Sequence, residues 1–196
     1  MHKTVIPNPV DLMTSSPVLP TYLDLLDHQR ETAFNALSGI TDEELWQRPG
    51  KNEWCIGEIF NHNYLLIAST IPYAKFAWKY FRWYGERNRN RPYKKDIPDY
   101  YRNEKFPMWT GFLWTPRHKP SKPVPFEQLK RELRDLHQEV RDFYEGKDED
   151  VLGNISLYDP YFGWLNLIVS LRLGIYHDQL HYDDVLAFAN ARTEPG

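Results

Sequence analysis

Cysteine is almost absent from this chain of 196 residues, which contains Cys55 alone. A single cysteine excludes an internal disulfide and fits a reducing compartment. Long apolar runs are also missing, because the most apolar segment, residues 165–175, carries Asn166 and Arg172 and is too short to span a bilayer. The first residues lack the continuous apolar stretch of a signal peptide. We therefore expect a cytoplasmic protein with no membrane partner.

An excess of positive charge is lacking as well. The chain has 24 Lys and Arg residues against 27 Asp and Glu residues, which gives a net charge of −3 and predicts no general affinity for polyanions. No alternating strand pattern of useful length is present. Aromatic residues, in contrast, make up 15% of the chain. We therefore expect a core or a cleft that is built on large flat side chains.

Four segments repeat apolar residues at helical spacing. They cover about residues 21–37, 54–84, 126–146 and 163–191, and Pro72 should end or kink the second of them. This pattern predicts an all-α fold, a four-helix bundle that forms a single domain over residues 21–191. Residues 1–20 hold four prolines without a helical period, and we expect an extended leader there.

Residues 86–125 form a long proline-rich insertion between the second and third helices. The insertion contains seven prolines, seven aromatic residues, and ten basic residues against four acidic ones. Basic and aromatic side chains together can bind single-stranded nucleic acid, but such a loop can also fold over an active site or simply pack. Because the whole chain is acidic and has no nucleic-acid-binding motif, we favour a lid or a packing role and expect no nucleic-acid partner.

The strongest candidates for chemistry are His177 and His181, four residues apart in the fourth helix. Side chains at this spacing share one face of a helix, about 6 Å apart along its axis, and can bind one metal ion. Solvated surface histidines are the simpler alternative, but the apolar residues around the pair indicate partial burial, and buried imidazoles need partners. If His62 of the second helix joins the pair, the three imidazoles leave an open coordination position, as in catalytic metal sites.

Two carboxylates near the pair, Asp178 and Asp184, are candidate catalytic residues that would orient a ligand or move a proton. Glu58 precedes His62 by four residues and could also be a ligand. We favour a capping role for it, with Cys55 as the N-cap of the second helix. Cys55 could act as a nucleophile only if its pKa were depressed, and no paired basic residue is evident, so we favour a cap or core role.

Two further histidines are candidates of lower rank. His28 follows Asp24 by four residues, a spacing that is typical of an exposed pair on the first helix. His137 stands among charged residues of the third helix, and we expect it at the surface.

The chain resembles the DinB superfamily of metalloenzymes in a series of features that occur in the same order. These are the segment from Leu45 to Trp54, then a small polar cap, an acidic residue and His62, and finally the H-x-x-x-H in the fourth helix. The resemblance covers residues 21–84 and 126–191. It implies an up-down-down-up four-helix bundle, often dimeric, with a divalent metal on His62, His177 and His181. The chain departs from the family pattern where Cys55 replaces a common serine and Asp184 a frequent glutamine.

Members of the family with assigned activity are mostly S-transferases or isomerases that use bacillithiol, mycothiol or glutathione. The resemblance therefore implies a metal-dependent transferase or hydrolase that acts on a small molecule, with a low-molecular-weight thiol as a candidate co-substrate. It also implies a homodimer as a candidate assembly. Zinc is the default ion for three imidazoles, and nickel or iron are alternatives. The rival hypothesis is a non-catalytic bundle that acts as a binding module through residues 86–125.

Overall fold

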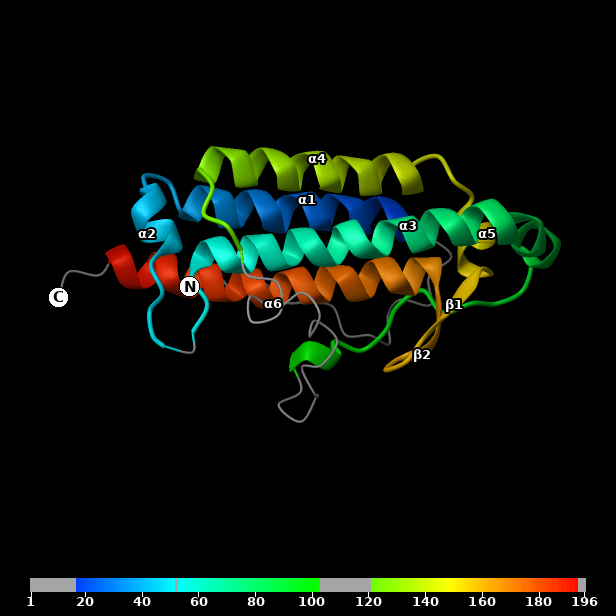
Figure 1. Cartoon of the computed structure of the whole chain (residues 1–196). Helices are drawn as coiled ribbons and strands as arrows, with labels where there is room; N and C mark the ends of the chain where they lie inside the picture. The colour runs from blue at the N-terminus through cyan, green and yellow to red at the C-terminus, as the bar shows by residue number, and fades with distance from the viewer. Residues whose placement is uncertain (1–16, 52, 103–120, 194–196) are drawn as a thin grey trace.

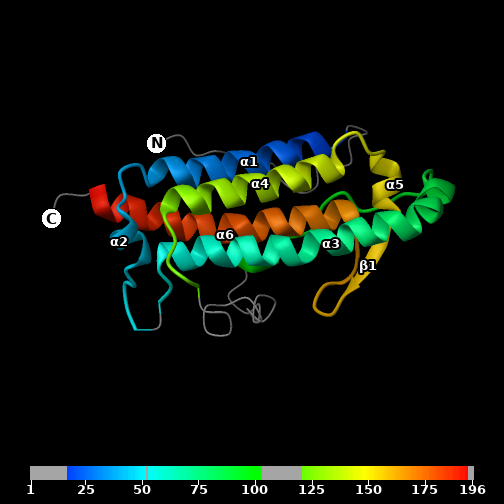
Figure 2. The ribbon, with the colours of Figure 1, turned by 45° about the horizontal axis from the view of Figure 1, so that its top comes forward.

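Four long helices lie side by side in the computed structural model, which describes residues 17–51, 53–102 and 121–193. Helices α1 and α6 run in one direction and α3 and α4 in the other (Figure 1, Figure 2). Helix α1 packs against α6 and α4, and α3 packs against the same two helices. The predicted four-helix bundle is confirmed, with the four helices α1 (Leu19–Ala36), α3 (Ile56–Asn88), α4 (Phe126–Tyr144) and α6 (Leu167–Thr193).

Helix α1 begins two residues before the expected start. Pro20 stands in its first turn, where a missing N–H costs nothing. The carboxylate of Glu149 accepts hydrogen bonds from the backbone N–H groups of Val18 and Leu19 at 2.7 and 3.0 Å. These contacts satisfy donors that a helix start leaves open. Most of the expected leader, residues 1–16, lies outside the described residues.

Helix α3 contains Pro72 but does not end there, and it continues to Asn88. The helix therefore includes the first three residues of the expected insertion. Later in the insertion, Tyr100–Arg102 forms a short 3-10 helix, η2, and residues 103–120 lie outside the described part of the chain. A short helix, α2 (Asp42–Trp46), precedes α3, and a capping box between Thr41 and Glu44 satisfies its first backbone N–H groups.

A small hairpin corrects the expectation that the chain has no strands. Strands β1 (Ser156–Asp159) and β2 (Gly163–Asn166) pair antiparallel after the short helix α5 (Glu149–Gly153), so α6 starts four residues later than predicted. The carboxylate of Asp159 accepts the N–H groups of Tyr161 and Phe162, and Gly163 takes a φ of 75° that favours glycine. Strands of four residues are too short for their alternation to be recognised in the sequence.

The described residues form three apolar core clusters, and the two larger ones both include residues of α3 and α6. One contains Leu26, Ile71 and Ile175, and the other contains Phe34, Phe60 and Tyr182. The three candidate histidines fall between these clusters in sequence, on the same two helices. Among the described residues, no helix combines the length and the apolar character that a bilayer span requires.

Two glycines in helices offer a paired test of this packing. A Cβ on Gly57 would lie 2.7 Å from ring atoms of Trp46, whereas a Cβ on Gly174 would meet nothing within 4 Å. We expect Gly57→Ala to lower the free energy of unfolding by about 1–3 kcal/mol because the indole must move. Gly174→Ala should raise it by up to about 1 kcal/mol because alanine favours helix. Urea unfolding measures both, and equal losses of stability in the two variants would contradict the packing of α2 on α3.

Candidate metal centre

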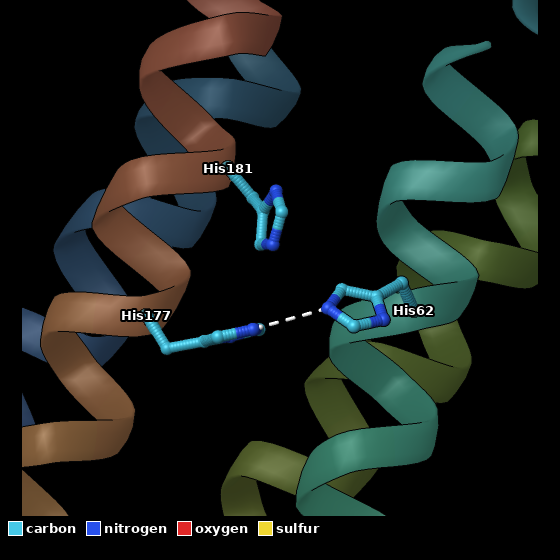
Figure 3. Close-up of side chains that lie close together, drawn as sticks. All are labelled: His62, His177 and His181. Atoms are coloured by element: carbon cyan, nitrogen blue, oxygen red, sulfur yellow. Dashed lines mark hydrogen bonds between the residues drawn. The ribbon is translucent and has the colours of Figure 1, made fainter. Parts of the chain in front are cut away.

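Helices α3 and α6 bring His62, His177 and His181 together in the interior of the bundle. Figure 3 shows the two α6 side chains projecting toward His62. The Nε2 atoms of His62 and His177 are 3.0 Å apart, and one nitrogen from each of the three rings lies within 4.8 Å of the other two. All three side chains are buried. The convergence that the H-x-x-x-H spacing left open is therefore present in the structure.

The three side chains fit a divalent ion. A tetrahedral zinc ion, with bonds of about 2.0–2.1 Å, holds its nitrogen ligands about 3.3 Å apart, so only small side-chain shifts are needed from the observed separations. Burial lowers the pKa of His177 and of His181, which keeps both rings neutral and able to offer a lone pair. Three imidazoles are a donor set that suits zinc, nickel and iron.

The first turn of α3 positions His62. The carboxylate of Glu58 accepts the backbone N–H of Cys55 at 3.0 Å and also pairs with Arg48. Glu58 is therefore a cap, as we favoured, and it is not part of the histidine group. Burial raises the pKa of the Cys55 thiol to about 11, so this thiol stays protonated at neutral pH. A protonated thiol is a poor nucleophile.

Two aromatic side chains cover the histidines. The Trp54 indole stacks on the His181 ring, with centroids 5.8 Å apart, and meets the His62 ring edge-on at 4.9 Å. Tyr101 meets the His177 ring edge-on at 5.4 Å. Together the two rings restrict the access of water to the imidazoles.

Tyr101 comes from η2 and thus from the proline-rich insertion, and no motif or period around it indicates that it reaches the site. The insertion also returns to α3 at its far end, where the hydroxyl of Ser121 accepts a hydrogen bond of 2.7 Å from the amide of Asn61. The described parts of the insertion therefore contact His177 through Tyr101 and the first half of α3 through Ser121.

The two candidate carboxylates occupy different environments. Asp184 is mostly exposed, with Oδ2 at 3.9 Å from Nδ1 of His181. Asp178 is 1% exposed, and its Oδ1 lies 3.6 Å from Nδ1 of His177. Burial acts to raise the pKa of Asp178, but contact with His137 and His177 outweighs it, so the pKa is lowered and the carboxylate keeps its charge.

His137 corrects the expectation that it lies at the surface. The side chain is fully buried, and its Nε2 is 3.5 Å from Oδ2 of Asp178. The charged residues next to His137 in sequence suggested exposure. On a helix, however, the residues that share its face are those four positions before it and three positions after it, and these are the buried Leu133 and Val140. His28, in contrast, is exposed on α1, as expected.

A groove of 960 Å³ lies elsewhere on the molecule, and none of the histidines that the structure describes lines it. It runs between the end of α3, residues 92–100 and the hairpin, and its lining includes Phe81, Tyr93, Tyr100, Phe162 and Trp164. The groove and the histidine cluster therefore have different lining residues.

Comparisons with known proteins agree with this arrangement. YfiT from Bacillus subtilis, described as a probable metal-dependent hydrolase with an unusual four-helix bundle topology, is structurally similar with a TM-score of 0.56. The two sequences are 12% identical, and the match covers 96% of this chain and 93% of that one, so the likeness shows the fold alone. A comparison with curated proteins finds no match. The sequence pattern of the DinB superfamily matches residues 25–185, which include all three histidines, and the chain therefore belongs to the DinB superfamily.

Proposed function

We propose that this protein is a metal-dependent enzyme that holds one divalent ion on His62, His177 and His181 and activates a water or a thiol for attack on a small molecule. The observation that carries the proposal is the convergence of three buried imidazoles from two helices, with ligand atoms within 4.8 Å of one another. Zinc is the first choice for this donor set, with nickel and iron as alternatives.

A divalent ion in this site would lower the pKa of a bound water or thiol and so supply a nucleophile at neutral pH. The protein contributes the surroundings. Trp54 and Tyr101 cover the rings and exclude bulk water. Asp178 places a buried carboxylate oxygen 3.6 Å from Nδ1 of His177. Asp184 places an exposed carboxylate next to His181, where it can accept a proton from an entering nucleophile.

Two reaction classes follow from the choice of nucleophile. Water leads to hydrolysis, the chemistry in the description of YfiT. A thiol leads to S-transfer, which the family resemblance implies. The only cysteine of the chain is buried and protonated, so the thiol would be an added co-substrate rather than a protein side chain.

Removal of a ligand tests the metal site. Protein purified without chelator or nickel resin should contain close to one ion per chain by elemental analysis, and zinc at 100 times its Kd should stabilise the fold by about 2.7 kcal/mol. We expect His62→Ala and His181→Ala to lose the ion while their helical circular dichroism is unchanged. His28→Ala, an exposed histidine of α1, is the matched control and should keep the ion. A wild-type chain without metal, whose melting temperature ignores zinc, would refute the site.

Substitution of Asp184 tests the proposed chemistry. We expect Asp184→Asn to lower turnover about 10²–10⁴-fold, the usual contribution of a general base, and to keep the metal. Asp183→Asn is the control, because this neighbouring exposed carboxylate accepts a hydrogen bond from Gln179 instead. The assay is a panel of electrophiles and esters with the metal-loaded chain, each with and without bacillithiol, mycothiol or glutathione.

Turnover that requires a thiol would identify a transferase, and turnover that does not would identify a hydrolase. Equal rates for Asp184→Asn and the wild type would contradict the role of Asp184. A chain that binds metal but turns over no member of the panel would favour the binding module over the enzyme.

A further inference from the structure

A carboxylate lies between two buried imidazoles behind the metal site. Oδ1 of Asp178 is 3.6 Å from Nδ1 of His177, and Oδ2 is 3.5 Å from Nε2 of His137. Asp178 and His177 stand on α6, whereas His137 stands on α4, a helix that supplies no ligand. His137 is 0% exposed and Asp178 is 1% exposed. The three side chains therefore link α4 to the candidate metal ligands through the interior of the bundle.

These groups have no other hydrogen-bond partners among the described residues. Both oxygens of Asp178, both nitrogens of His137 and Nδ1 of His177 are buried and unpaired. Leaving such groups unpaired is expensive, and a buried charge costs most of all. The two N···O separations are slightly longer than a hydrogen bond, so a small rotation of the carboxylate and the rings would form both bonds.

We propose that His137 is a positioning residue that acts on the metal site through Asp178. This inference rests on the proposed function. A metal-bound imidazole usually donates its second N–H to a carboxylate, which fixes its tautomer and orientation. Asp178 does this for His177, so that Nε2 of His177 faces the metal. His137 donates Nε2–H to the other oxygen of Asp178 and holds the carboxylate in place.

Replacement of His137 tests the proposal through metal binding rather than through activity. In the full chain, His137→Leu removes the donor and should weaken zinc binding about 10–100-fold, measured by competition with a chromophoric chelator. The visible absorption of the Co²⁺-loaded protein should also change, because His177 is then held less firmly. His137→Gln, whose amide can donate to the same oxygen, should restore most of the affinity and the spectrum.

Two further variants separate positioning from a purely structural effect. Leu133→Ala removes a fully buried side chain one turn away on α4 and should lower stability without changing the zinc affinity or the Co²⁺ spectrum. In an Asp178→Asn background, His137→Leu should have little further effect on zinc affinity, because the coupling runs through the carboxylate.

The outcomes distinguish this proposal from the proposed function. If the wild type binds no zinc, both the proposed function and the role of His137 are wrong. If the wild type binds zinc and folded His137→Leu binds it equally well, only the role of His137 is wrong. If His137→Leu does not fold, the test passes to His137→Gln, and full zinc affinity combined with an altered Co²⁺ spectrum in that variant would contradict the proposal. If His137→Leu folds and weakens zinc binding equally in the wild-type and the Asp178→Asn backgrounds, the coupling through Asp178 is overturned.

Discussion

The arrangement of this protein depends on the meeting of three imidazoles where α3 and α6 face each other. A helix that carries His177 and His181 on one face needs a polar partner opposite, because buried ring nitrogens are costly without one. His62 is one such partner, because its Nε2 atom lies 3.0 Å from Nε2 of His177. The apolar clusters on either side hold the two helices in register, and a divalent ion would complete the coordination of the three rings.

The side chains around the imidazoles act in two layers. Trp54 and Tyr101 close the site against bulk water, one from the turn before α3 and one from the proline-rich insertion. Behind the rings, Asp178 and His137 form a polar link into α4. Under the proposed function, the same bundle supplies ligands from two helices, orientation from a third, and cover from its loops.

The helical periods were sufficient to predict the bundle, and the H-x-x-x-H spacing was sufficient to place His177 and His181 on one face of its last helix. The residue pattern left open whether His62 joins this pair, and the family resemblance implied that it does. Glu58 was assigned to its cap because its position relative to the helix start is a local property. The roles of His137 and Tyr101 could not be predicted in this way. His137 stands among polar neighbours in sequence, and its burial depends on how α4 is rotated against α6. Tyr101 reaches His177 only through the path of an insertion that has no regular period.

The position of a bound zinc ion would show whether the three histidines form a metal centre. Crystals of the full chain grown with zinc should give one strong anomalous peak at the zinc edge, about 2.0–2.1 Å from a nitrogen of each of His62, His177 and His181. A peak at another site, such as Cys55, or no peak between these rings at saturating zinc would contradict the assignment of the three histidines as a metal centre.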